Sequence, residues 1–228
     1  MFEFVTKREY QPYKVEVDNF IKKIHNILRK EKIVNFRDDL IGSAGRRLIT
    51  RVENGNKGFD FDYNLEITKF YDDKFQNPKI LKNIFRNIFD KTFDDSYEWA
   101  EDSTSVFTIK KVDKKHSRII FSVDFAIVHY YEDMKGNERQ EYIRFDKNTN
   151  GYSWCDRPEA TNHRQSAMAI RQKGLWNELR ELYLKNKNKE PNKKSRIVYY
   201  QTLDTIYKKH FQKINIPGTG DIFIKNII

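Results

Sequence analysis

One stretch of ten residues decides the fold class of this chain. It reads Gly58-Phe59-Asp60-Phe61-Asp62-Tyr63-Asn64-Leu65-Glu66-Ile67. Apolar and polar side chains alternate from Phe59 to Ile67, which predicts a β-strand with one buried face. Residues two apart project from the same side of a strand, so Asp60 and Asp62 are expected to be neighbours on its polar face.

This pair of aspartates calls for an explanation, because aspartate is unfavourable in strands and the two charges repel each other. A solvated surface pair is one interpretation. A divalent metal ion with oxygen ligands, bound by Asp60 and Asp62, is the other.

A third acid lies in the most hydrophobic segment of the chain. That segment reads Ile119-Ile120-Phe121-Ser122-Val123-Asp124-Phe125-Ala126-Ile127-Val128, with both faces apolar as in a central strand. A buried carboxylate at Asp124 must be protonated, paired with a lysine or arginine, or bound to a metal. With Asp60 and Asp62 upstream, the simplest interpretation is three carboxylates on neighbouring strands, binding two divalent ions ~4 Å apart.

Composition indicates a globular protein. The 228 residues suffice for one domain, or a domain with a small helical annex, and 14% are aromatic and 38% hydrophobic. No run approaches the roughly 20 apolar residues that span a bilayer, and the start of the sequence lacks a secretory pattern. The single Cys155 excludes an intrachain disulfide framework and suits a reducing compartment. We therefore expect a cytoplasmic location and no membrane segment.

The charge balance favours a polyanionic partner. Lysine and arginine total 43 against 33 aspartate and glutamate residues, a formal net charge of +10. Such a surface suits a nucleotide or nucleic acid. Surface lysines that are only solvated would give the same balance.

The remaining pattern predicts an α+β fold: a mixed β-sheet flanked by helices, with a helical C-terminal part. We expect a core that contains the three acids over 1–158, and helices over 159–228 that complete its cleft. Expected helices cover 17–28, a segment opened by Asn77-Pro78, and two segments after 161. Expected strands cover 38–41, 105–112, 118–131, 141–146 and 222–224. Residues 148–158 are expected to form a loop, and 185–194 a charged, solvated linker.

These motifs resemble the nucleotidyltransferases of the DNA polymerase beta superfamily. A Gly-Ser turn at Gly42-Ser43, the Asp60 and Asp62 strand, and then Asp124 follow in the order of that family. The resemblance implies that Gly42 and Ser43 hold the phosphates of a nucleoside triphosphate. It also implies that Asp60 and Asp62 hold both Mg²⁺ or Mn²⁺ ions, and that Asp124 completes the site for the ion that activates the acceptor hydroxyl.

A second resemblance concerns the C-terminal helices. In oligoadenylate synthases and cyclic dinucleotide synthases, a lysine on one helix and a serine opening the next grip the triphosphate. The similar positions here are Lys173, or Arg171 in its place, and Ser195. A helix N-terminus offers N–H donors to phosphate, although Ser195 would also serve as a plain N-cap. Arg46 is a further candidate for stabilising phosphate charge.

The resemblance implies transfer of a nucleoside monophosphate to a hydroxyl with release of pyrophosphate. Two departures leave the acceptor open: the gap from Ser43 to Asp60 is long, and the chain is short for a full synthase. A second nucleotide or RNA is favoured by the net charge. Alternatives are a non-catalytic nucleotide- or RNA-binding module of the same fold, and a toxin or defence enzyme that modifies tRNA, protein or a small molecule and has a neutralising protein partner.

Other candidate features carry less information. An aromatic ring is expected to stack on the base, and the candidates, each of which could equally be core, are Tyr152, Trp154, Tyr199 and Tyr200. The five histidines lack metal-ligand spacing, and a Cys155/His163 nucleophile pair lacks an orienting residue. The segment 217–221 lacks the lysine of a P-loop and is interpreted as a turn.

Overall fold

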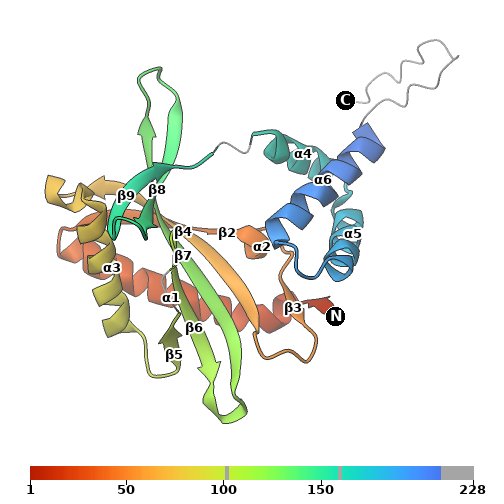
Figure 1. Ribbon diagram of the computed structural model, residues 1–228, viewed down its shortest axis with the longest axis horizontal. Helices are drawn as coiled ribbons and strands as arrows, with labels where there is room; N and C mark the ends of the chain where they lie inside the picture. Colours follow the sequence, from red (N-terminus) through yellow and green to blue (C-terminus); the bar gives the residue numbers. More distant parts are fainter. Residues whose placement is uncertain (101–102, 159–160, 212–228) are drawn as a thin grey trace, which may run out of the picture.

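The computed structural model describes residues 1–100, 103–158 and 161–211. Within these ranges a seven-stranded mixed sheet forms the centre of the molecule (Figure 1). Strand β4 pairs in parallel with β7 and antiparallel with β2. The strands in spatial order are β2 (Val34–Ile41), β4 (Phe59–Phe70), β7 (Arg118–Glu132), β6 (Phe107–Asp113) and β5 (Tyr97–Trp99), while β8 (Glu138–Asp146) pairs with β7, and β9 (Gly151–Asp156) with β8. The predicted α+β class is confirmed.

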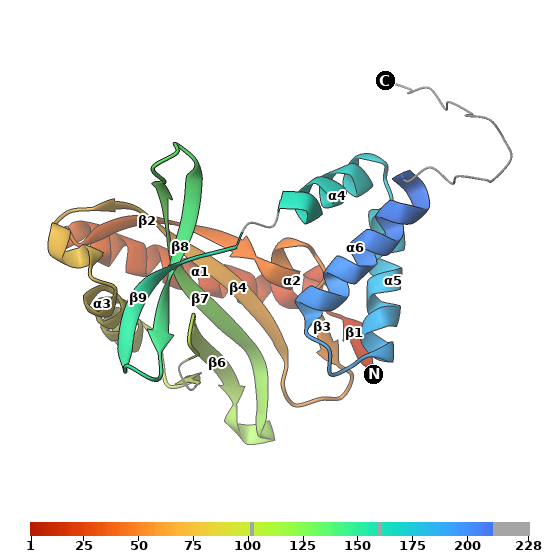
Figure 2. The ribbon, with the colours of Figure 1, turned by 45° about the horizontal axis from the view of Figure 1, so that its top comes forward.

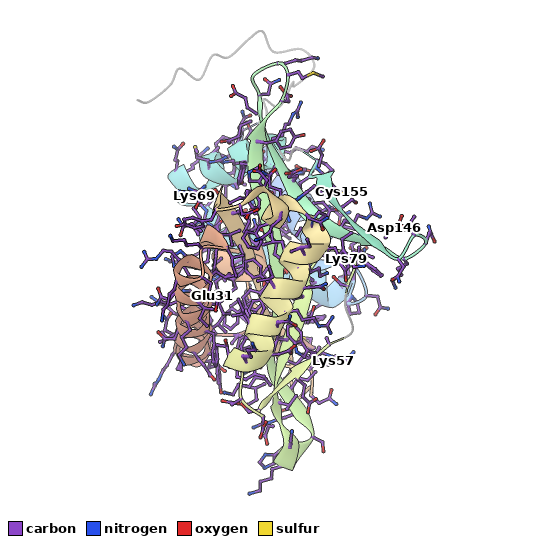
Figure 3. The ribbon with its side chains drawn as sticks, turned by 90° about the vertical axis from the view of Figure 1, so that its left-hand side faces the viewer. Glu31, Lys57, Lys69, Lys79, Asp146 and Cys155 are labelled. Atoms are coloured by element: carbon purple, nitrogen blue, oxygen red, sulfur yellow. The ribbon has the colours of Figure 1, made fainter. Side chains whose placement is uncertain are left out.

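Two helices cover the apolar face of this sheet. Helix α1 (Lys7–Lys30) and helix α3 (Pro78–Thr92) lie side by side against it (Figure 3). Phe61 meets the ring of Tyr10 edge to face, and the Tyr63 hydroxyl donates to Asp18 Oδ1 at 2.7 Å. The alternation of β4 therefore works as predicted: its apolar residues face the helices, and the acidic residues face the other way.

Three predictions of local structure need correction. Helix α1 starts ten residues before the predicted 17, because Thr6 and Glu9 form a capping box at its N-terminus. Part of the predicted loop 148–158 is strand β9, which finds its partner across the hairpin in β8. The predicted solvated linker 185–194 is helical as far as Lys189, and Lys187 within it is only 7% exposed.

The C-terminal helices have a hydrophobic cluster of their own. Helices α4 (Thr161–Gln172), α5 (Trp176–Lys189) and α6 (Ser195–Phe211) pack around it beside α2 (Gly42–Gly45), as Figures 1 and 2 show. Its buried members are Leu48, Ile170, Leu179, Tyr183, Val198, Tyr199, Leu203 and Ile206. The buried residues of the other cluster lie between 5 and 143. The boundary at 158/159 remains a prediction.

A two-stranded sheet joins the two clusters. Strand β1 (Phe2–Phe4) pairs with β3 (Thr50–Val52), and Phe4 packs on the C-terminal cluster. The Phe2 backbone N–H donates to Asn188 Oδ1 at 2.6 Å, and Asn188 Nδ2 donates back to the Phe2 carbonyl at 3.0 Å. Strand β1 therefore fixes the C-terminal end of α5 to the rest of the molecule.

Short 3₁₀ helices η1 (Asp73–Gln76) and η2 (Lys114–His116) complete the fold. Among the residues described, no helix combines the length and apolar character needed to cross a bilayer. The predicted turn at 217–221 and strand at 222–224 lie outside the described residues.

Candidate active site

Asp62 and Asp124 face each other across the parallel pairing of β4 and β7. The register makes them direct Cα partners, and it places Asp60 opposite Ser122. Neighbouring strands lie ~4.8 Å apart, so the two carboxylates are within reach of each other. All three acids share the sheet face that α1 and α3 leave uncovered. The structure thus brings together the three carboxylates selected from the sequence.

Burial and mutual repulsion disfavour the charged forms of these acids. Burial raises the pKa of Asp124 to about 6 against the effect of a 2.6 Å hydrogen bond from Thr108 Oγ1, and the charges of Asp62 and Asp60 add to the rise. Burial, followed by the charge of Asp60, also raises the pKa of Asp62. Arg46 and the Ser43 backbone N–H oppose that second rise. A bound cation would relieve both penalties.

The donor set suits a hard divalent cation, because it consists of carboxylate oxygens on adjacent strands. As the side chains stand, however, no group of three acidic, histidine or cysteine residues in the described ranges is arranged to hold a metal. Each carboxylate has a separate partner: Asp60 accepts from Ser122 Oγ, Asp124 from Thr108, and Asp62 from the Ser43 N–H. Binding of a metal ion by all three carboxylates would therefore require them to exchange these partners for the ion.

The turn that follows β2 lies against Asp62 and requires glycine at its first position. Strand β2 ends at Ile41, which is paired with Asp62, and the chain then turns into the four-residue helix α2. Gly42 has φ +63°, and a Cβ there would lie 1.8 Å from Asp62 Oδ2. Glycine is needed both for the left-handed backbone and for the close approach. The adjacent Ser43 N–H consequently reaches the carboxylate of Asp62.

Arg46 lies between the acids and the C-terminal helices. Its guanidinium is 4.5 Å from the centre of the Tyr199 ring on α6, and its charge lowers the pKa of Asp62. Leu48, two residues later, belongs to the C-terminal cluster, and its N–H donates to the Ser43 carbonyl at 2.8 Å. The Gly42–Arg47 segment is therefore attached to both parts of the molecule.

Lys187 and Ser195 meet at the N-terminus of α6. Lys187 Nζ donates to Ser195 Oγ at 2.7 Å and lies 4.5 Å from the centre of the Phe2 ring. Burial lowers the pKa of Lys187, while the charge of Asp60 raises it, so this ammonium lies within electrostatic range of Asp60. A lysine and a helix N-terminus together form a site suited to phosphate.

Lys173 lies elsewhere. Its Nζ donates to the His210 carbonyl at 3.1 Å and is 4.9 Å from the centre of the Phe211 ring, at the C-terminal end of α6. Ser195 opens the same helix, fifteen residues away and therefore roughly 22 Å from it. The structure does not bring Lys173 to Ser195, and Arg171 instead stacks 3.7 Å from the Trp176 ring centre. Lys187 occupies the position expected of Lys173.

The four aromatic candidates are all engaged in packing. Trp154 and Tyr152 lie against the core of the sheet, and Trp154 Nε1 donates to the Gln76 carbonyl at 2.8 Å. Tyr199 is buried beneath Arg46. Tyr200 is half-buried and stacks on His163 with ring centres 3.9 Å apart.

Some residues of the site were missed from the sequence. Leu179, Tyr183 and Lys187 recur every fourth residue on α5, so the helical pattern could have placed Lys187 on the buried face. Ser122, two residues before Asp124, shares its face by strand alternation. No local pattern indicates that Thr108 is the partner of Asp124, because that contact depends on the register of β6.

Comparisons with solved structures identify the fold. A c-di-GMP synthase, CdnE from Capnocytophaga granulosa, superimposes with a TM-score of 0.58 at 14% identity, over 92% of this chain and 64% of its own. The GTP-bound form of Vibrio cholerae DncV gives 0.57 at 10% identity, over 89% and 68%. Its 3′-deoxy ATP-bound form gives 0.53 at 12% identity, over 88% and 53%. The chain therefore spans between about half and two thirds of the length of these structures. No protein-family model and no curated protein sequence matches the chain. The predicted resemblance to nucleotidyltransferases is confirmed at the level of the fold.

Proposed function

We propose that this protein transfers a nucleoside monophosphate from a nucleoside triphosphate to a hydroxyl group and releases pyrophosphate. The observation that carries the proposal is the pairing of Asp62 with Asp124, with Asp60 and the Gly42 turn beside them, in a fold shared with cyclic dinucleotide synthases. Neighbours named for GTP and 3′-deoxy ATP support a nucleoside triphosphate as donor. A second nucleotide is the favoured acceptor, and RNA is the alternative.

The donor triphosphate would lie between the Gly42–Ser43 turn and the start of α6. Ser43 and the N–H groups of that turn, together with Arg46, would hold it on one side. Lys187 and Ser195 would hold it on the other, with Lys187 taking the role expected of Lys173. Charge-assisted hydrogen bonds from these groups would orient the α-phosphate toward the acids.

The carboxylates of Asp60, Asp62 and Asp124 would hold Mg²⁺ or Mn²⁺. Such ions supply the positive charge that lowers the pKa of an acceptor hydroxyl and stabilises departing pyrophosphate. Asp124 would orient the acceptor oxygen in this scheme. Arg46 would offset charge that develops on the phosphates during transfer.

The test follows a radioactive α-phosphate. The protein is incubated with each α-labelled nucleoside triphosphate and Mg²⁺, alone, with unlabelled nucleotides, and with RNA. Pyrophosphate release and the labelled product are then measured. We expect label in a nucleotide product, and Asp60→Asn or Asp124→Asn to abolish it. Asp204→Asn changes an exposed aspartate on α6 and is the matched control. Full activity in the two site variants would refute the assignment.

A further inference from the structure

The Gly42–Arg47 segment ends in a Schellman motif that lacks the usual glycine. After the four-residue helix α2, the Leu48 N–H donates to the Ser43 carbonyl at 2.8 Å. The Arg47 N–H donates to the Ala44 carbonyl at 3.0 Å. These two bonds define the motif, and its left-handed residue is Arg47, with φ +59°. Glycine usually occupies that position, because any other side chain strains a left-handed backbone.

A side chain of the C-terminal helices holds this strained residue. Arg180 on α5 donates from Nη1 to the Arg47 carbonyl, and its guanidinium lies 4.4 Å from the centre of the Phe4 ring. A charged donor forms a stronger hydrogen bond than a neutral one, and the ring of Phe4 adds a cation–π contact. Because the direction of the Arg47 carbonyl depends on the backbone conformation of that residue, the bond from Arg180 favours the left-handed form.

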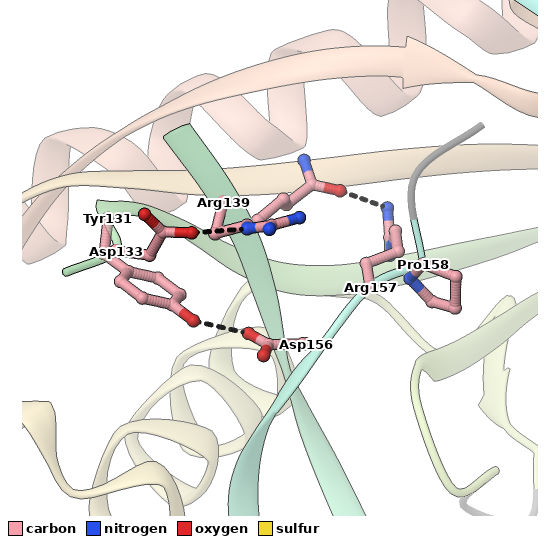
Figure 4. A pocket seen from close by; sticks show the side chains of 7 residues that line it. Tyr131, Asp133, Arg139, Asp156, Arg157 and Pro158 are labelled. Atoms are coloured by element: carbon pink, nitrogen blue, oxygen red, sulfur yellow. Dashed lines mark hydrogen bonds and ion pairs between the residues drawn. The ribbon is translucent and has the colours of Figure 1, made fainter. Parts of the chain in front are cut away.

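Arg180 has no acidic partner that would account for its position. Arg139, which lines an open pocket of about 450 Å³ beside the β7–β8 hairpin, shows the ordinary arrangement: its Nε pairs with Asp133 Oδ2 at 3.0 Å (Figure 4). Among the residues that the structure describes, no carboxylate forms an ion pair with Arg180. The backbone carbonyl of Arg47 is the acceptor that this guanidinium takes instead.

The strained residue lies between two groups assigned to the donor triphosphate and one residue of the helical cluster. Arg46 precedes it, and Leu48, which follows it, is buried among the C-terminal helices. If Arg47 relaxed to a right-handed conformation, the Schellman motif would open and the bond from Leu48 to Ser43 would break. Ser43 and Arg46 would then lose their fixed positions beside the acids.

We infer that Arg180 is a positioning residue for the donor triphosphate: it keeps Arg47 left-handed and thereby holds Ser43 and Arg46 ready for the phosphates. The inference rests on the proposed function and adds a residue that touches neither the substrate nor the acids. Arg47 is the hinge of the segment, and Arg180 offsets its strain. Without Arg180 a smaller fraction of the protein has the binding-ready turn, and the apparent affinity falls by that fraction.

The first test measures affinity for the donor triphosphate by titration calorimetry with Mg²⁺. The probes are ATP and GTP analogues with a methylene bridge between the α- and β-phosphates, so that no transfer occurs. We expect Arg180→Gln to weaken binding about five- to twentyfold, and Arg180→Lys to weaken it less because lysine still donates. Arg144→Gln alters an exposed arginine on β8 and should bind as the unaltered protein does. Equal affinities of Arg180→Gln and this control would overturn the inference.

Glycine at position 47 tests the strain itself. Arg47→Gly and Arg47→Ala both remove the arginine side chain, but only glycine adopts a positive φ without strain. Combined with Arg180→Gln, the glycine variant should therefore bind the analogues about fivefold more tightly than the alanine variant. A loss of packing among the helices would not respond to this difference. Equal affinities of the two double variants contradict the hinge.

Hydrogen exchange separates this inference from the proposed reaction, because it needs no nucleotide. The Leu48 amide hydrogen, which is bonded to Ser43, is followed by NMR after circular dichroism has shown that each variant is folded. We expect about tenfold faster exchange in Arg180→Gln and a return toward the original rate when Arg47→Gly is added. Unchanged exchange contradicts the role of Arg180 even where transfer occurs. Faster exchange in a protein that releases no pyrophosphate supports the hinge and refutes the reaction alone.

Steady-state kinetics shows whether Arg180 acts on binding or on the chemical step. In Arg180→Gln the KM for the nucleoside triphosphate should rise more than kcat falls, because the three acids keep their places. A loss confined to kcat would contradict a role in holding the phosphates.

Discussion

Single residues set the geometry of the acids, and Gly42 shows this most directly. Its positive φ and the 1.8 Å approach that a Cβ would make to Asp62 Oδ2 are two separate constraints. Gly174 has φ +74° with nothing within 4 Å of a Cβ, so it carries only the first constraint. A comparison of Gly42 with Gly174 therefore separates the effect of backbone strain from that of steric exclusion.

We predict that Gly42→Ala destabilises the protein by about 2–3 kcal/mol and abolishes transfer, because the new methyl group displaces the Asp62 carboxylate. Gly174→Ala should cost only about 1 kcal/mol and keep transfer intact. Urea denaturation and pyrophosphate release measure the two effects. Equal losses of activity would show that steric exclusion at Asp62 is unimportant.

Asp124 should stabilise the folded protein less than asparagine would. Its folded pKa of about 6 lies above the unfolded value of 3.8, so the folded state binds the proton more tightly. The protonated carboxyl therefore contributes to the stability of the folded state in full below about pH 4, and this contribution is lost as the pH rises through about 6. At neutral pH the charged form lowers the free energy of unfolding by up to roughly 3 kcal/mol relative to the protonated form.

From this we predict that Asp124→Asn raises the melting temperature at pH 7.5 while abolishing transfer. The gain should shrink at pH 4.5, where the native carboxyl is protonated. Mg²⁺ with nucleoside triphosphate should stabilise the unaltered protein more than the variant. Calorimetry at the two pH values provides the measurement. A variant less stable than the parent at pH 7.5 would contradict the assigned cause.

At the scale of elements, a strand or a site residue could be predicted from the sequence only where its pattern is local. Asp60, Asp62 and Asp124 could be selected because strand alternation and a broken apolar run are visible in the sequence itself. Strand β9 could not be predicted in this way. The alternation of Tyr152 and Trp154 with polar residues is too short to indicate a strand unless its partner β8 is known. Lys187 was missed because its neighbours are lysines and asparagines, although its own side chain lies on the buried face of α5.

The difference between Lys187 and Lys173 can be measured. We predict that Lys187→Met raises the KM for the nucleoside triphosphate at least tenfold, because it removes a charge-assisted contact to phosphate. Lys173→Met should change it less than twofold, since that ammonium caps the distant end of α6. Steady-state kinetics with a fixed acceptor decides between them. A larger increase in KM for Lys173→Met than for Lys187→Met would instead assign Lys173 to the phosphate site.

At the scale of the whole molecule, the described residues form two hydrophobic clusters, one between the sheet and its helices and one among the C-terminal helices. The fold class and the helical C-terminal part followed from periodicity, because both depend on long, regular segments. The pairing of β1 with β3 could not be predicted from periodicity, because each strand has three residues and the two are separated by about fifty positions of sequence. Tertiary contacts, rather than propensity, determine such short strands.

This bridge predicts an effect of Asn188 on nucleotide binding. Asn188→Ala removes both hydrogen bonds to the backbone of Phe2, whose ring lies against the Lys187 ammonium. We expect a loss of about 1–2 kcal/mol in the free energy of unfolding and a severalfold weaker affinity for nucleoside triphosphate. Asn192→Ala, in the exposed turn after α5, is the control. Titration calorimetry and urea denaturation give the two values. Unchanged affinity would show that β1 does not position the lysine.

Leu48 has a consequence for motion. The glycine-serine turn is tethered to the C-terminal helices through this side chain, whereas the next residue, Ile49, is anchored in the sheet cluster. If the helices swing relative to the sheet, Leu48 displaces one end of the turn while Ala44 and the contact of Gly42 with Asp62 hold the other end at the sheet. The affinity for the donor and the alignment of the reacting groups would then change together. Substitutions within the helical cluster, far from any phosphate, would therefore slow turnover.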